Sequence, residues 1–177
     1  AFVNRLFTPN ECNKIIEYAT KNADEKDATV NHDKVKLDRR DSKLCWLYPE
    51  DESKWIFEKI AYAITHLNDH YFKFDIYGLG EGLQFTTYKA PSGFYGKHLD
   101  RMYGYLVRKL SVSILLTDPA EFEGGDLCFH FDNEPKIMKK EQGMLYMFPS
   151  WTLHEVTPIT QGERTSLVCW ANGKPFR

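Results

Sequence analysis

The sequence predicts an α+β chain that is mainly β, built either as a sandwich or as a double-sheet jelly roll. Two segments with helical periodicity come first, and short β-rich runs separated by turn residues come afterwards. Short strands at regular spacing are typical of sandwiches and jelly rolls, whereas a parallel α/β sheet needs a helix between successive strands. The order of helices before strands favours helices packed against one sheet.

The first predicted helix begins at Thr8, where the threonine caps the helix, a proline follows, and Glu11 completes a capping box. Apolar residues then repeat on one face of this helix, at Cys12, Ile15, Ile16 and Ala19. A second helix is predicted from about Ser53 to Tyr71, because apolar side chains form a stripe along it. The segment between the helices, residues 23–36, is charged and aperiodic and is expected to be a loop.

Six strands are predicted after the second helix. They are Leu83–Tyr88, Leu110–Leu116, Asp126–Phe131, Gly143–Phe148, His154–Ile159 and Arg164–Trp170. We expect the last two to form a hairpin with an odd-numbered loop, residues 161–163, in which Thr160 pairs with Arg164. His154 then pairs with Trp170, and the side chains of His154 and Arg164 lie on one face of the sheet.

The length of 177 residues is enough for one core and too short for two, because folding buries about 70% of the surface of such a chain. We therefore expect a single domain over residues 1–177, with a mainly helical N-terminal support over 1–72 and a strand-rich core over 73–177. Hydrophobic residues at 42% and charged residues at 27% are typical of a soluble globular chain and exclude a disordered or collagen-like one.

The net charge of −2 provides no basic field for a phosphate backbone, which argues against nucleic acid as a partner. The four cysteines form no C-x-x-C pair, which argues against a zinc knuckle and for free thiols in a reducing compartment. No apolar run approaches the length of a membrane span, and the first residues carry no signal-peptide pattern. A cytoplasmic location without membrane contact is expected, and a leader removed before Ala1 stays open.

The pattern His98-Leu99-Asp100 places an imidazole and a carboxylate two positions apart, and such residues share one face of an extended chain. A second imidazole, His154, opens a later predicted strand. Two histidines and one carboxylate leave coordination positions open on an octahedral ion, which is the facial triad of non-haem Fe(II) oxygenases. Each of these residues taken alone is more often structural, and a non-catalytic cupin-like metal-binding module would also keep the histidines.

Arg164 follows His154 by ten positions and lies on the next predicted strand. A guanidinium can hold a carboxylate through two hydrogen bonds, so this residue is suited to anchor the far end of a dicarboxylic 2-oxo acid that chelates the metal. Tyr88 precedes the His98-Leu99-Asp100 pattern and can donate a hydrogen bond to the same carboxylate. A cupin-like module needs neither residue.

Three segments resemble the Fe(II)/2-oxoglutarate dioxygenases of the prolyl 4-hydroxylase type, and most closely the PKHD-type hydroxylases. They are YKAPSGFYGKHLD (88–100), LSVSILLTDPAEFEGGD (110–126) and GMLYMFPSWTLHEVTPITQGERTSLVCW (143–170). In the N-terminal half, Arg40-Asp41-Ser42 looks like the short R-x-S segment near the active site of prolyl hydroxylases. Animal-type prolyl 4-hydroxylases carry lysine where this chain has Arg164, and this departure favours the PKHD-type branch.

The resemblance implies a double-stranded β-helix (jelly roll) with N-terminal helices packed on one sheet. It implies Fe(II) as the metal, 2-oxoglutarate as co-substrate and ascorbate as a candidate further cofactor. By this resemblance the catalytic metal ligands are His98, Asp100 and His154, the co-substrate residues are Tyr88 and Arg164, and the substrate residues are Arg108 and Trp170.

The expected activity is hydroxylation of a prolyl residue in a peptide or protein, with release of succinate and CO₂. A hydroxylase of a small molecule or of another residue type is the alternative within this chemistry. A nucleic-acid demethylase of the same superfamily would normally carry a second arginine six positions after the first, where this chain has Trp170. A peptide or protein substrate is therefore the expected partner, and the sequence does not indicate an oligomeric state.

Overall fold

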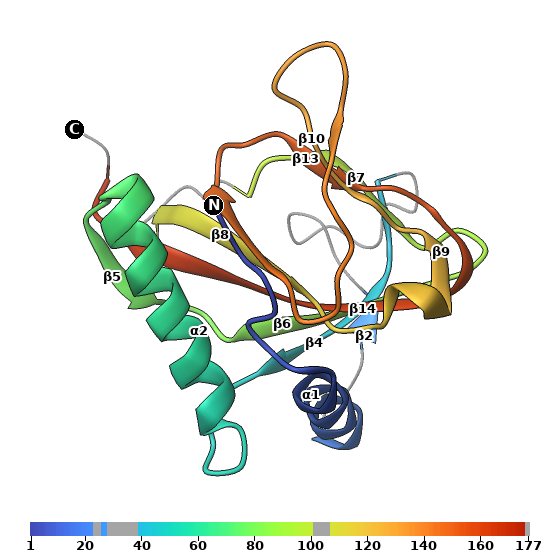
Figure 1. Cartoon of the computed structure of the whole chain (residues 1–177), viewed down its shortest axis with the longest axis horizontal. Helices are drawn as coiled ribbons and strands as arrows, with labels where there is room; N and C mark the ends of the chain where they lie inside the picture. The colour runs from blue at the N-terminus through green and yellow to red at the C-terminus, as the bar shows by residue number, and fades with distance from the viewer. Residues whose placement is uncertain (23–25, 28–38, 101–106, 176–177) are drawn as a thin grey trace.

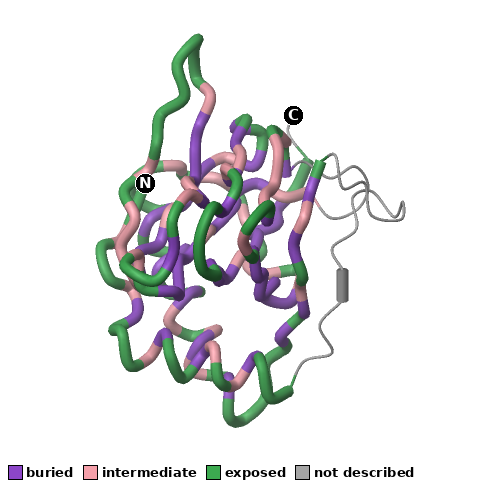
Figure 2. Tube along the Cα trace, turned by 90° about the vertical axis from the view of Figure 1, so that its right-hand side faces the viewer, coloured by how far each residue is buried: buried purple, intermediate pink, exposed green. Residues whose placement is uncertain are grey.

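The computed structural model describes residues 1–22, 26–27, 39–100 and 107–175. Two antiparallel sheets face each other, and the helices α1 and α2 lie against the outer side of the larger sheet (Figure 1). Buried positions run through the middle of the molecule, while the outer loops are mainly exposed (Figure 2). This arrangement confirms the predicted mainly β fold with N-terminal helices packed on one sheet.

In the described part of the chain the large sheet has nine strands, in the order β1-β12-β8-β14-β6-β4-β2, with β5 and β9 also paired to β14. Its strands are β1 (Phe2–Val3), β2 (Lys26–Asp27), β4 (Lys43–Leu47), β5 (Ile76–Leu79), β6 (Leu83–Lys89), β8 (Val107–Leu115), β9 (Phe122–Gly124), β12 (Leu145–Pro149) and β14 (Ile159–Gly173). The small sheet has the order β11-β10-β13-β7-β3. Its strands are β3 (Arg40–Asp41), β7 (Phe94–His98), β10 (Leu127–Phe129), β11 (Lys136–Ile137) and β13 (His154–Val156).

The helix α1 (Pro9–Asn22) begins with the predicted capping box. The backbone N–H of Thr8 donates to Glu11 Oε2 at 2.8 Å, and the N–H of Glu11 donates to Thr8 Oγ1 at 3.3 Å. The helix α2 (Lys54–Leu67) continues into the π-helical turn η1 (Asn68–Phe72), so the predicted extent of the second helix is confirmed. None of the helices in the described ranges is long and apolar enough to cross a membrane.

Alternation along the strands separates two cores. Along β14, the side chains of Leu167, Cys169 and Ala171 face the helices and join a large cluster with Ile15 and Ile60. The other face of the large sheet meets the small sheet across a second cluster. This inter-sheet cluster contains Tyr88, Leu115, Phe122, Leu127, Phe129, Phe148, Val156 and Ile159. Because successive strand residues point to opposite faces, Arg164 faces the small sheet.

The predicted hairpin between the last two strands is wrong. The strand β13 lies in the small sheet and pairs with β7 and β10, with His154 opposite His98. The strand β14 lies in the large sheet, where Arg164 is opposite Tyr88 rather than Thr160. The expectation that His154 pairs with Trp170 fails for the same reason, although both His154 and Arg164 face the space between the sheets.

Gly162 explains why the segment 161–163 is not a turn. Its φ is +74°, and a Cβ atom there would lie 2.1 Å from the carbonyl oxygen of Glu121 in the short 3₁₀ helix η2 (Pro119–Glu121). The glycine allows β14 to bend closely past η2 and β9 and to continue as one strand. A Gln-Gly pair in the sequence therefore marks a close backbone approach here.

The structure places strand β4 within the N-terminal segment 1–72, beside β6. Sequence periodicity also missed β7, the strand that ends at His98. The loop predicted over residues 23–36 lies outside the described residues, except for Lys26–Asp27, which form β2. The single domain over residues 1–177 stays a prediction.

The capping box predicts a measurable stability cost for Thr8→Ala. This change removes the hydroxyl that accepts from the helix N–H and that also donates to Glu11 Oε2 at 3.0 Å. We expect the free energy of unfolding in urea to fall by about 1 kcal/mol, whereas Thr8→Ser retains the cap and most of the stability. Equal stability of the alanine and serine variants would contradict this role.

Candidate metal centre and co-substrate pocket

Three side chains, two from strands of the small sheet and one from the segment after β7, converge at the end of this sheet. His98 closes β7, Asp100 follows two residues later, and His154 opens β13. The Nε2 atom of His98 lies 3.5 Å from Asp100 Oδ1, and the Nε2 atom of His154 lies 3.6 Å from Asp100 Oδ2. One ligand atom from each residue lies within 4.8 Å of the others, so the three side chains could hold one metal ion.

Backbone carbonyls fix the orientation of both imidazoles. The Nδ1 atom of His98 contacts the carbonyl oxygen of Gly96 at 2.7 Å, and Nδ1 of His154 contacts that of Thr152 at 2.9 Å. A carbonyl oxygen only accepts, so each Nδ1 must carry the hydrogen. In the neutral imidazole the lone pair then lies on Nε2, which points toward Asp100 in both residues. This is the ring form and the supporting contact that metal-binding histidines require.

The charge states also suit a divalent metal. Burial by itself would raise the pKa of the Asp100 carboxyl, but His98, His154 and the Ser111 hydroxyl together hold that pKa well below its usual value. Burial lowers the pKa of His154 and outweighs the opposite effect of Asp100. An ionised carboxylate and a neutral imidazole are the forms that bind a cation.

Aromatic side chains hold the two histidines in place. The ring of Tyr95 stacks on His98 with 3.5 Å between ring centroids, and Arg40 covers the Tyr95 ring at 4.4 Å from its centroid. The predicted R-x-S segment therefore reaches the centre through Tyr95. On the other side, Phe148 of the inter-sheet cluster packs edge-on against His154 at 4.8 Å.

Arg164 is a buried cation without a carboxylate partner in the described part of the chain. Only 4% of the residue's surface is exposed to solvent. Its Nη1 donates to Ser166 Oγ at 3.2 Å, while its buried Nε has no hydrogen-bond partner among the described residues. The guanidinium carbon lies 5.4 Å from the centre of the Tyr88 ring, so the two predicted co-substrate residues are adjacent. Burial lowers the pKa of Arg164, against the effects of Tyr88 and Asp126.

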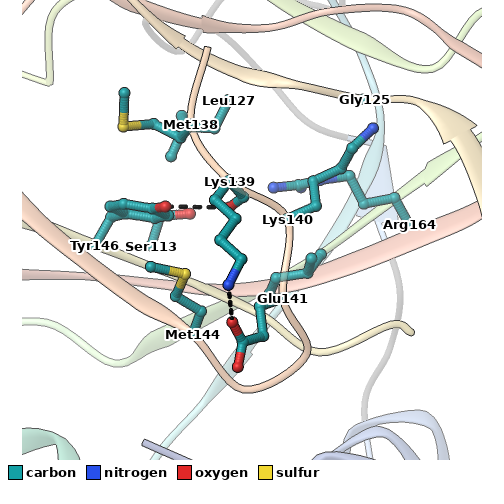
Figure 3. A pocket seen from close by; sticks show the side chains of 11 residues that line it. Ser113, Gly125, Leu127, Met138, Lys139, Lys140, Glu141, Met144, Tyr146 and Arg164 are labelled. Atoms are coloured by element: carbon teal, nitrogen blue, oxygen red, sulfur yellow. Dashed lines mark hydrogen bonds and ion pairs between the residues drawn. The ribbon is translucent and has the colours of Figure 1, made fainter. Parts of the chain in front are cut away.

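Arg164 also lines a pocket at the edge of the inter-sheet space (Figure 3). Lys140 and Arg164 lie across this pocket from Tyr146 and Met138 in this view (Figure 3). The pocket wall includes Gly125, where a Cβ atom would lie 2.9 Å from Cδ of Arg164. The backbone therefore approaches the arginine more closely than another residue would allow.

The predicted substrate residues Arg108 and Trp170 also lie together. The guanidinium carbon of Arg108 lies 3.5 Å from the centre of a Trp170 ring, and two of its nitrogens donate to the carboxylate of Glu81 at 2.6 and 2.7 Å. The buried indole N–H of Trp170 has no hydrogen-bond partner among the described residues. The neighbouring ring of Trp46 lies 6.1 Å away and is 38% exposed, so aromatic surface is available beside this pair.

Sequence reasoning missed three residues around these sites. Tyr95 lies three positions before His98, and alternation alone does not indicate that the two rings stack. Glu81 pairs with Arg108 across 27 positions, for which the sequence carries no signal. Lys139 and Lys140 both line the pocket, and nothing in the sequence indicates that only Lys140 pairs with Asp126.

The donor set fits the groups that the sequence pattern implies. Two Nε2 lone pairs and one carboxylate leave positions open on an octahedral ion, as non-haem Fe(II) requires. Arg164 offers a buried guanidinium nitrogen without a partner, and such a group favours an anion with planar oxygens. Both sites border the same inter-sheet cluster, through Phe148 and Tyr88.

Known proteins share this sequence pattern and this fold. A PKHD-type hydroxylase from Prochlorococcus marinus is 42% identical over 90 residues, which are 50% of this chain and 40% of that protein. The matched part of the chain thus spans about two fifths of that relative's length. Among solved structures, a prolyl-4-hydroxylase from Pseudomonas putida is 19% identical with a TM-score of 0.75, covering 99% of this chain and 92% of that one.

A prolyl hydroxylase from Trichoplax adhaerens, solved with a peptide fragment of the hypoxia inducible factor oxygen degradation domain, shares the fold at a TM-score of 0.82. It is 16% identical and covers 97% of this chain and 82% of that one.

These likenesses confirm the predicted jelly roll and the predicted resemblance to the prolyl 4-hydroxylase and PKHD type. The family model of the 2OG-Fe(II) oxygenase superfamily matches residues 83–172. This match includes both histidines, the carboxylate between them and the buried arginine, and the chain belongs to that superfamily.

Proposed function

We propose that this chain is an Fe(II)- and 2-oxoglutarate-dependent hydroxylase that acts on a prolyl residue of a peptide or protein. The observation that carries the proposal is the buried, partly unpaired guanidinium of Arg164, which borders the same inter-sheet cluster as the triad of histidines and carboxylate. A metal-binding module without catalysis has no use for such a cation. A 2-oxo acid with a second carboxylate uses the metal at one end and the arginine at the other.

His98, Asp100 and His154 are the proposed metal ligands. Their Nε2 atoms and carboxylate oxygens converge, and the carbonyls of Gly96 and Thr152 hold both rings in the binding tautomer. When bound, Fe(II) and 2-oxoglutarate supply the oxidation of an unactivated C–H bond by O₂, with release of succinate and CO₂. The residues of the chain supply orientation, charge and exclusion of water.

Arg164 is the proposed anchor for the distal carboxylate of 2-oxoglutarate, with Tyr88 as a second donor. The pairing of Arg164 opposite Tyr88 on β14 and β6 puts both side chains on the inter-sheet face. A carboxylate between them would satisfy the free Nε of the arginine and compensate its buried charge.

Arg108 and Trp170 are the proposed substrate residues. Nε and Nη2 of Arg108 already donate to the Glu81 carboxylate, so we assign Arg108 to holding the Trp170 ring. The unpaired indole N–H of Trp170 can then donate to a carbonyl oxygen of a bound peptide. The apolar surface of Trp46 suits an uncharged ring such as that of proline. A relative of the same fold solved with a peptide supports a polypeptide substrate.

The proposed function is tested by succinate release on incubation with Fe(II), 2-oxoglutarate and a library of proline-containing peptides. We expect release that depends on the peptide, with an added mass of one oxygen on the prolyl residue. Repeating the assay with and without ascorbate tests the expected dependence on this reductant. Peptide-independent release that is stimulated only by small molecules would contradict the prolyl assignment.

The metal assignment predicts that His154→Ala abolishes metal binding while the protein stays folded. Loss of one of three ligands leaves too few donors to hold the ion at micromolar concentrations. Calorimetric titration with Mn(II), a redox-stable substitute, measures the binding, and circular dichroism checks the fold. The matched control is His66→Ala, which removes an exposed histidine of α2. Unchanged Mn(II) affinity in the His154 variant would exclude this ligand.

The co-substrate assignment predicts that Arg164→Met weakens 2-oxoglutarate binding without lowering the stability of the ligand-free protein. Removing one partner of a buried charge pair costs about 3–5 kcal/mol, so the KM for 2-oxoglutarate should rise more than about a hundredfold. The ligand-free protein has no partner carboxylate to orphan, and its Tm should not fall. Arg164→Lys, which keeps the charge but loses the planar fork, should lie between the two. An unchanged KM in the methionine variant would move the anchor elsewhere.

A further inference from the structure

Lys140 occupies the wall of the pocket that Arg164 lines, and it is held at three points. Its Nζ lies 2.9 Å from Asp126 Oδ1 and donates to the carbonyl oxygen of Gly124 at 2.8 Å. It also lies 5.3 Å from the centre of the Phe122 ring. The lysine thus connects the loop after β11 to the turn between β9 and β10.

The same turn packs directly on Arg164. Gly125 has a φ of +62°, and a Cβ atom there would lie 2.3 Å from Ile159 Cδ1 and 2.9 Å from Arg164 Cδ. The next residue is Asp126, whose carboxylate is paired with Lys140 at the wall of the pocket that Arg164 lines. Burial lowers the pKa of Arg164, and Tyr88 and then Asp126 act against this lowering. Asp126 is therefore the acidic group placed to compete with an incoming carboxylate.

The charges of the pocket explain what the lysine contributes. Lys139 and Glu141 of the pocket wall pair with each other and add no net charge. Arg164 and Lys140 are cations and the adjacent Asp126 is an anion, so these three groups carry one net positive charge, which one carboxylate neutralises. Without Lys140 the net charge of these groups is zero before a ligand arrives. Asp126 then keeps only a long contact, 3.5 Å from the Thr157 hydroxyl to its Oδ2, against turning toward the guanidinium. A partly exposed ion pair of this kind usually contributes little to stability. Beside a buried guanidinium, its effect on ligand binding is larger, because the low-polarity surroundings screen charge weakly.

We propose that Lys140 is a positioning residue that holds Asp126 away from Arg164 and so keeps the guanidinium open for the distal carboxylate of 2-oxoglutarate. This inference rests on the proposed function and deepens it. Under this proposal, the preference for a dicarboxylic over a monocarboxylic 2-oxo acid depends on Lys140, which does not itself bind the ligand. It also predicts that the lysine becomes dispensable once Asp126 is neutral.

Calorimetric titration of the Mn(II)-loaded protein without O₂ tests the inference in the absence of turnover. The ligands are 2-oxoglutarate and 2-oxovalerate, which has the same chain length and no distal carboxylate. We expect Lys140→Met to raise the Kd for 2-oxoglutarate about tenfold, equivalent to about 1.4 kcal/mol, and to leave the Kd for 2-oxovalerate unchanged. The double variant Lys140→Met/Asp126→Asn should recover the affinity of the parent protein.

The control variant is Lys136→Met, which removes the same charge from an exposed position on β11 and should bind both ligands as the parent does. Failure of the double variant to recover affinity would overturn the inference, because it would mean that the lysine binds the ligand itself or only holds the loop. An equal loss for both ligands would overturn it as well. No binding of 2-oxoglutarate to the parent protein would overturn the proposed function first and this inference with it.

Discussion

The burial of Arg164 is the constraint on which the site depends. Arg164 is 4% exposed and its Nε has no partner among the described residues, and such a group costs stability unless a ligand completes it. The proposed carboxylate ligand would remove this cost. The two-sheet architecture makes the burial feasible, because Tyr88 covers the cation from the neighbouring strand. Gly125 lets the backbone close over its other side.

The registers of the two sheets set the rest of the geometry. In the small sheet His154 is opposite His98, and the short loop after β7 brings Asp100 back to both imidazoles. In the large sheet Arg164 is opposite Tyr88. Alternation along β6 and β14 sends Tyr88 and Arg164 into the space between the sheets, while Phe85 and Leu167 of the same strands belong to the cluster packed against α1 and α2. The two faces of these strands thus contribute to the helix-side core and to the candidate co-substrate site.

The sequence predicted what depends on local chemistry. The capping box at Thr8, the mainly β fold and the family motifs were readable because each is a pattern of adjacent residues. The pairing of β13 and β14 was predicted wrongly, since Gly162 fits a turn and a close approach equally well until Glu121 is known to lie beside it. The Lys140–Asp126 pair was not predictable, because only folding brings the two side chains together. The roles of the site residues stay predictions.

The central claim is that one space between the sheets holds both ends of 2-oxoglutarate. The most direct test is a crystal structure of the protein grown without O₂ in the presence of Mn(II) and 2-oxoglutarate. The account predicts the metal bound by Nε2 of His98, Nε2 of His154 and the Asp100 carboxylate. It also predicts the distal carboxylate of the ligand on the Arg164 guanidinium. A metal held by other residues, or a ligand whose distal carboxylate does not reach Arg164, would contradict it.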